Sequence, residues 1–264
     1  MTDLLAAEWI KLWSLRSTWL GLLCSALIAI AICVNASFAD LANWASYSPM
    51  TQEVFVPVWS IRDAFTDPAG LVLMLAASSI GAITVVGEYS SGLIRTTFAA
   101  VPARRQVMAA KVMVVTAVFL AYGTAVSAAA FVLSQAVLGG KGVSIGYPGA
   151  IRAVAASAVL APVCALIGMG VGALIRHTAT TIVTSTALLF LVPRLLDSRR
   201  YHWVAVLHDA MPASAWDRLT ETAAETAVNM TRFPPTISGS WAAFALWSLA
   251  AAVATVLSVH RRDL

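Results

Sequence analysis

The sequence has little charge for its length. Only 11% of its 264 residues are Asp, Glu, Lys or Arg, whereas 59% are hydrophobic and the mean hydropathy is +0.81. Soluble domains carry roughly 25% charged residues, so this chain cannot cover its apolar side chains with a charged surface. Disordered proteins are excluded as well, because they are poor in apolar residues. The composition therefore indicates a protein that is surrounded mainly by lipid.

Residue patterns typical of catalytic sites are also lacking. Cys24, Cys33 and Cys164 lie inside apolar runs, without metal-ligand spacing and in an odd number that gives no disulfide framework. No His-Glu-x-x-His or Gly-x-Ser-x-Gly pattern occurs. The only Gly-Lys pair, Gly140-Lys141, is followed by glycine instead of Ser or Thr, so the chain has no P-loop. We expect no enzyme, no metal and no directly bound cofactor, and the modest net charge of +4 predicts no nucleic-acid partner.

Long stretches without charged residues predict six membrane-spanning helices. About 20 helical residues cross the hydrocarbon core, and the predicted spans are approximately 18–38, 68–87, 112–137, 153–175, 178–195 and 240–259. The fifth fits a short span, a tilted span or half of a re-entrant hairpin. The charge-free stretch 41–52 is shorter, contains several polar residues and Pro49, and is predicted to be a loop. We expect an all-α polytopic membrane protein with one transmembrane domain over residues 1–264.

The first fifteen residues predict a helix that lies in the membrane plane before the first span. Leu5, Trp9, Leu12 and Trp13 recur at helical spacing, with Glu8, Lys11 and Ser14 opposite. Trp9 and Trp13 suit the headgroup region, and Lys11 and Arg16 suit anionic lipid. We expect no cleaved signal peptide, because the apolar run that follows is too long.

The basic residues indicate the orientation of the chain. An even number of spans places both termini on one side of the membrane, but Lys and Arg divide almost equally between the two sides. Arg95, Arg104, Arg105 and Lys111 are concentrated in the short loop after the second span. The positive-inside rule then predicts that this loop and both termini are cytoplasmic, in a plasma-membrane protein.

Apart from Arg194 at the end of the fifth, no charged residue lies inside a predicted span, which disfavours an ion-coupled or proton-coupled carrier. The polar residues there are mostly Ser and Thr, which form hydrogen bonds between helices. Gly168 and Gly172 form a Gly-x-x-x-Gly motif with Gly170 between them. The motif predicts a close helix contact, either within the chain or across a dimer.

The loop from Gly87 to Lys111 is the most distinctive segment. Gly92 permits a turn, after which Leu93, Ile94, Thr97 and Phe98 would form one face of a short helix that ends before Pro102. Arg95, Arg104 and Arg105 surround this helix. A short apolar and cationic helix between two spans suits docking into a groove on a partner. The alternative is a solvated loop that only obeys the positive-inside rule.

Three stretches resemble ABC type-2 transporter permeases. They are Glu-Trp-Ile-Lys-Leu-x-Ser-Leu-Arg-Ser-Thr-Trp at 8–19, Gly-Glu-Tyr-Ser-Ser-Gly-Leu-Ile-Arg-Thr-Thr-Phe at 87–98, and Pro-x-Arg-Arg with Ala-Lys within 102–111. The resemblance implies six spans after an interfacial helix, and short extracellular helices between spans five and six. It also implies a coupling helix at 93–98 that contacts a separate ATPase subunit. Glu88 would close the second span, and Arg95, Arg104 and Arg105 would lie near the ATPase.

These observations predict the membrane subunit of an ATP-binding cassette exporter. ATP would act through the separate ATPase subunit, and a second permease copy or a paralogue would complete the transporter. The low charge within the spans favours an amphipathic or drug-like substrate. The alternative is a non-transporting membrane assembly or sensor protein that recruits a cytosolic partner through the same loop.

Overall fold

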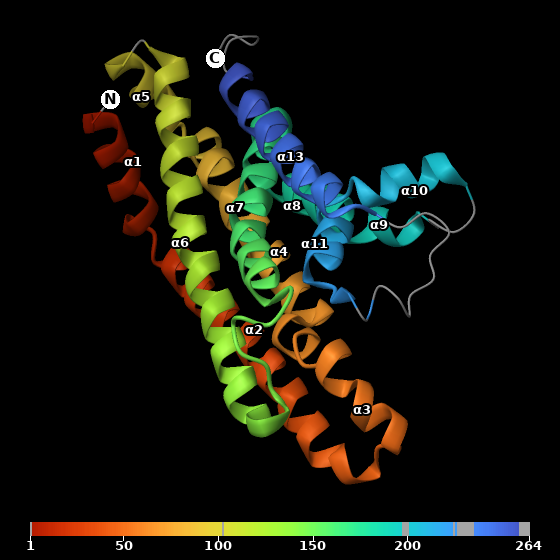
Figure 1. The fold of residues 1–264 in the computed structure, drawn as a ribbon. Coiled ribbons are helices and arrows are strands. Elements are labelled where there is room, and N and C mark those ends of the chain that lie inside the picture. Colours follow the sequence, from red (N-terminus) through yellow and green to blue (C-terminus); the bar gives the residue numbers. More distant parts are fainter. Residues whose placement is uncertain (1, 102, 197–200, 224, 226–234, 259–264) are drawn as a thin grey trace.

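The computed structural model describes residues 2–101, 103–196, 201–223, 225 and 235–258, without the side chains of Pro57 and Arg95. Within these ranges the chain is helical and contains no strand. Six of its helical segments are long and apolar enough to cross a membrane (Figure 1). The predicted all-α class and the predicted number of spanning helices are therefore confirmed by length and composition.

The described part of the chain consists of a series of helices. In chain order they are α1 (Thr2–Ser14), α2 (Arg16–Asn43), η1 (Trp44–Ser46), α3 (Pro49–Val58), η2 (Arg62–Phe65), α4 (Asp67–Ser90), α5 (Leu93–Ala100), α6 (Arg104–Leu138), η3 (Gly139–Lys141), α7 (Ala150–Ile175), α8 (Thr178–Thr186), η4 (Ala187–Leu191), α9 (Val192–Leu195), α10 (His202–Asp209), α11 (Pro212–Thr220) and α13 (Ile237–Leu257). The apolar segments that could span a membrane are built on α2, α4, α6, α7, the run α8–η4–α9, and α13.

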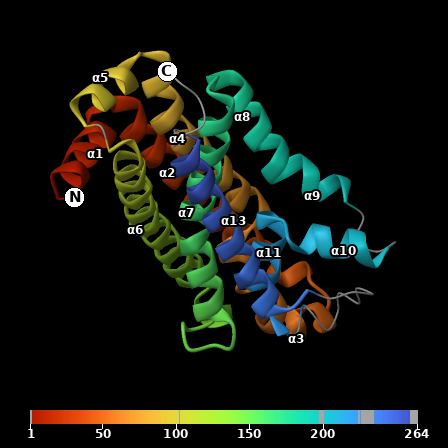
Figure 2. The same cartoon turned by 90° about the horizontal axis from the view of Figure 1, so that it is seen from above.

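The helix α7 lies at the centre of the bundle, packed against α4, α6 and α13 (Figures 1 and 2). Glycines allow the backbones to approach closely. A Cβ atom on Gly168 would lie 1.9 Å from the carbonyl oxygen of Ser78 in α4, and Gly172 also faces α4. Gly170 points the other way, towards Ala251 of α13. Gly168 and Gly172 thus make their close contact within the chain.

The fifth apolar segment is one continuous helix of 18 residues formed by α8, η4 and α9. Its middle part is a π turn, in which the N–H of Val192 bonds to the carbonyl of Ala187 five residues earlier. It is the least hydrophobic of the six segments. It therefore differs from the other five in composition and in backbone geometry.

The stretch 41–52 is helical for most of its length, so the predicted loop is wrong. The helix α2 continues to Asn43, η1 follows, and α3 begins at Pro49. Ser48 caps α3 by accepting a hydrogen bond of 3.2 Å from the N–H of Thr51. A serine followed by proline at the first helical position is a favourable helix start. The same residue types are also common in loops, so composition alone does not distinguish the two structures.

Two short helices before α13, α10 and α11, lie wholly within the described part of the chain, and α11 is held firmly in the bundle. In α11, the side chain of Trp216 is 2% exposed, and its indole N–H donates a 2.9 Å hydrogen bond to the hydroxyl of Ser157 in α7. The ring covers Gly70 of α4 so closely that a Cβ atom there would lie 2.5 Å from it. Of the loop 197–239, residues 197–200, 224 and 226–234 lie outside the described part.

Candidate functional site

One end of the bundle gathers the segments that the sequence singled out. The helix α5 lies there between the end of α4 and the start of α6, with α1 beside α6 (Figures 1 and 2). The helix α13 ends at the same level, where the guanidinium of Arg176 donates a 3.1 Å hydrogen bond to the carbonyl of Ser258. The first helix and the last one thus both reach the end of the bundle that carries α5.

The helix α5 begins at a turn that requires glycine. Gly92 has a φ of +74°, a left-handed conformation that other residues adopt at a cost. Ile94 and Phe98 then point into the bundle, with exposures of 2% and 6%. Leu93 remains 48% exposed. The apolar face that we expected to be displayed is therefore mostly covered by the chain itself, and Leu93 is its accessible part.

The basic residues that follow α5 lie at the surface. Arg104 and Arg105 begin α6, and both are exposed. The guanidinium of Arg104 lies 5.4 Å from the ring centroid of Phe98. Arg95 lies on α5, but its side chain is outside the described part of the structure. Leu93, Arg104 and Arg105 together form an exposed apolar and cationic surface, which we call the α5 surface.

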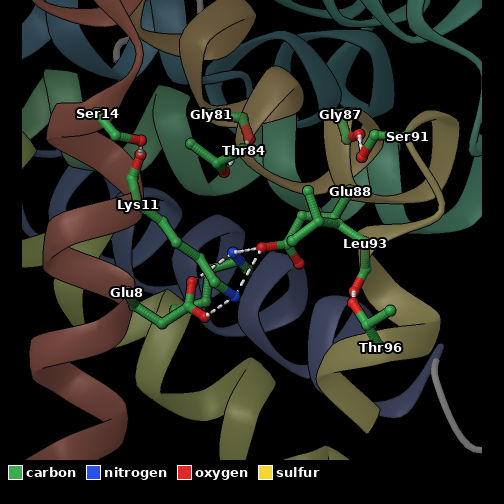
Figure 3. A network of polar contacts seen from close by, with 11 residues as sticks. Glu8, Lys11, Ser14, Gly81, Thr84, Gly87, Glu88, Ser91, Leu93 and Thr96 are labelled. Atoms are coloured by element: carbon green, nitrogen blue, oxygen red, sulfur yellow. Dashed lines mark hydrogen bonds and ion pairs between the residues drawn. The ribbon is translucent and has the colours of Figure 1, made fainter. Parts of the chain in front are cut away.

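Four charged side chains from three helices form an ion network at the base of α5. Lys11 of α1 donates to Glu8 of the same helix at 2.8 Å and to Glu88 of α4 at 3.1 Å. Lys111 of α6 also donates to Glu8, and to Glu88 at 2.9 Å. Figure 3 shows these contacts converging between α1 and α4. The network thus joins α1 and α4, which precede α5 in the sequence, to α6, which follows it.

The network is neutral and largely shielded from water. The side chains of Glu8 and Lys111 are each 5% exposed, and that of Glu88 is 12% exposed. Burial lowers the pKa of Lys11, but the hydrogen bonds and charges of Glu8 and Glu88 outweigh it and raise the pKa above 10.5. Lys11 therefore stays charged at neutral pH. Breaking a shielded pair leaves a charge without its partner, which is strongly destabilising.

A cavity of about 370 Å³ lies beside the network. Its walls are mainly apolar and include Leu12, Ile83, Val114 and Val115. The four charged residues line its polar side, together with hydroxyl groups such as that of Thr84 (Figure 3). The cavity lies between α1, α4 and α6, so a movement of α1 relative to the other two helices would change its size.

The two faces of α1 differ from the expected ones. Glu8 and Leu12 are buried against the bundle, whereas Trp9, Ile10 and Trp13 are 51%, 67% and 42% exposed. The charged residues that we expected opposite the membrane thus face the protein. The two tryptophan rings pack together with centroids 5.7 Å apart, leaving an aromatic outer face that suits a membrane interface. Arg16, at the start of α2, is exposed.

The sequence did not reveal the ion network. Glu8 and Lys11 lie one helical turn apart, a spacing that favours an ion pair. Their contacts with Glu88 and Lys111, by contrast, depend on how three helices pack. The only signal in the sequence was the position of single charges next to long apolar runs.

No protein-family model matches the chain, and no curated protein matches its sequence significantly. The residue patterns and the geometry of this end of the bundle are the features that indicate a function.

Proposed function

We propose that the protein is the membrane subunit of an ATP-binding cassette exporter, and that the α5 surface docks on a separate ATPase subunit. The observation that supports this most directly is the placement of α5. It is a short helix at the end of the bundle, between the second and third long apolar helices, with Leu93 exposed on it and Arg104 and Arg105 exposed at the start of α6, directly after it. Exposed apolar and cationic side chains on a short helix and the turn that follows it suit a groove with acidic walls.

The buried side of α5 provides a route from the partner to the spans. A push on the α5 surface would move Ile94 and Phe98, which are buried in the bundle. The ends of α4 and α6 are connected through Glu88 and Lys111. We infer that closure of the ATPase displaces α5, and that the ion network makes α1, α4 and α6 respond together.

The distribution of charged residues supports an orientation in the membrane and a class of substrate. We propose that both termini are cytoplasmic in the plasma membrane, because Arg104, Arg105 and Lys111 lie at the end where α1 begins. A second copy or a paralogue would complete the transport path. The low charge of the spans suits an amphipathic or drug-like substrate.

The double variant Arg104→Glu/Arg105→Glu tests the docking surface. It reverses two exposed charges without altering the core, so the protein should insert and fold normally. The tagged chain is purified in mild detergent from its native host, and the co-purifying ATPase activity and transport are measured. We expect both to fall at least about tenfold, the effect of losing roughly 1.4 kcal/mol of docking free energy. Arg104→Lys/Arg105→Lys keeps the charges and should retain most of the activity.

Two outcomes would contradict the proposal. Full transport by the charge-reversed variant would exclude the α5 surface as the docking site. A stoichiometric partner that hydrolyses no ATP would instead favour a membrane assembly or sensor protein that recruits a cytosolic partner.

A further inference from the structure

A buried carboxyl group lies at the opposite end of the bundle from α5. Asp63 belongs to η2, the short turn that leads from α3 into α4, and it is 6% exposed. Its Oδ2 atom is shielded and has no hydrogen-bond partner among the described residues. A carboxylate in such a place is costly unless another group compensates its charge.

A second carboxyl group lies close to Asp63. The side chain of Asp40, near the end of α2, lies within hydrogen-bonding reach of Asp63. The hydroxyl of Tyr47 donates a 2.7 Å hydrogen bond to Oδ1 of Asp40. An ionised carboxylate only accepts hydrogen bonds, so Asp40 and Asp63 would repel each other if both were ionised.

The neighbouring cations are engaged elsewhere. Arg62, next to Asp63, donates to Asp67 and lies 3.8 Å from Asp217. Lys141 lies over the ring of Trp44, 4.6 Å from its centroid.

The helices that pack most extensively against η2 are α2 and α6. Apart from Asp40, the only other charged residue of α2 is Arg16 at its far end, and the charged residues of α6 are Arg104, Arg105 and Lys111, all near its start. The remaining titratable neighbour is the thiol of Cys33 on α2. Within the described part of the chain, no cation therefore neutralises the carboxyl pair.

We propose that Asp40 and Asp63 form a proton-binding site in which the two carboxyl groups share one proton, and that this proton holds η2 against α2. The protonated carboxyl donates its O–H to the other carboxylate, which replaces a repulsion by a hydrogen bond. Loss of the proton to water leaves two facing carboxylates, which separate and loosen the contact between η2 and α2. The site lies far from α5 and does not depend on the proposed transport function.

Cys33 offers a natural reporter of this contact. It is 2% exposed and lies on α2 near Asp63 and Thr66. In a Cys24→Ser background, Cys164 is completely buried, so a water-soluble maleimide reports on Cys33. The labelling rate of the purified chain in detergent is measured from neutral to alkaline pH.

Asp63→Asn supplies the baseline for this measurement. In this variant the labelling rate of Cys33 should rise with pH only because the thiol ionises. In the Cys24→Ser protein that keeps Asp63, the rate should rise by a further factor of about ten as the site opens, because one pKa unit corresponds to a tenfold change in the equilibrium. Identical pH profiles for the two proteins would overturn the proposal. Asp67→Asn removes a neighbouring exposed carboxylate, and it should behave like the parent.

Thermal unfolding provides a second measurement that does not depend on the thiol. Between neutral and alkaline pH, the unfolding temperature of the wild type should fall by roughly 2–4 °C more than that of Asp40→Asn or Asp63→Asn. If one variant fails to fold, the other still decides. A wild type whose pH dependence equals that of either variant would contradict the proton site. Disappearance of the alkaline loss on adding Ca²⁺ would also overturn it, in favour of a cation site.

Discussion

Lys111 donates a hydrogen bond to Glu8 although the two residues lie 103 positions apart in the sequence, and both side chains are 5% exposed. The contact fixes the first helix of the chain to the start of α6. Because Glu88 joins the same network from α4, the two long helices that flank α5 are connected at its base. A change in any one of these charges should therefore be felt in all three helices.

We expect Lys111→Met to destabilise the protein by about 3–5 kcal/mol, the usual cost of breaking a buried ion pair. The substitution leaves Glu8 and Glu88 with only Lys11 as a counter-ion. The free energy of unfolding in detergent, measured with a denaturant series, gives the result. The double variant Glu8→Gln/Lys111→Met removes one charge of each sign and should recover part of the loss. Equal stability of Lys111→Met and the wild type would show that the network contributes nothing.

The network should also produce a dependence on alkaline pH. The folded-state pKa of Lys11 is raised above 10.5. Its stabilising contribution is therefore fully present below the pKa of the unfolded chain and is lost as the pH rises through the folded-state pKa. Lys11→Met should be less stable than the wild type at neutral pH, and the difference should shrink above about pH 10.5. Parallel stability curves through the alkaline range would contradict this expectation.

Adding one methyl group to α7 should test the close packing at the bundle centre. In Gly168→Ala the new carbon would lie 1.9 Å from the carbonyl oxygen of Ser78, so α4 and α7 must move apart. We expect a loss of about 1–3 kcal/mol, the usual cost of overpacking.

Gly87→Ala is the matched control, because its nearest neighbour would be 4.0 Å away. It should be neutral or stabilising, since alanine favours helices. Similar unfolding temperatures for the two variants would refute the close contact.

The two tryptophans of α10 and α11 should respond differently to truncation. Trp216 is 2% exposed and bonded to Ser157, so Trp216→Ala should cost about 3–5 kcal/mol. Trp203 is 67% exposed, and Trp203→Ala should change stability by less than about 0.5 kcal/mol. Thermal unfolding of both variants in the same detergent decides. A large effect at Trp203 would mean that α10 packs on something other than this chain.

The sequence predicted the features that depend on local pattern. Charge-free runs predicted the six long apolar helices, and Gly92 predicted the turn before α5. Contacts between distant segments were out of reach. The sequence places Glu8 on the polar face of α1, but in the structure this residue lies against α6. A helical pattern shows which residues share a face, and it does not show which neighbouring helix covers that face.

The carboxyl pair was missed for a related reason. Asp40 and Asp63 lie just outside the predicted spans 18–38 and 68–87, and nothing in the sequence pattern relates them to each other. The longer α2 and the turn η2 bring them together beside the bundle. Their proximity depends on how α2 packs against η2, and a sequence pattern does not show that packing.

The π turn at Ala187–Leu191 has a consequence for experiments that scan the fifth apolar segment. An i→i+5 bond inserts one residue into the helical repeat, which rotates everything after it by about 100° relative to an uninterrupted α-helix. Residues that would share a stripe by sequence spacing, such as Thr181 and Leu195, therefore do not share one in space. In a cysteine or tryptophan scan of this helix, the periodic pattern of sensitive positions should therefore change phase at the π turn. A single helical period fitted to the whole segment would assign the wrong lipid-facing side to one of its halves.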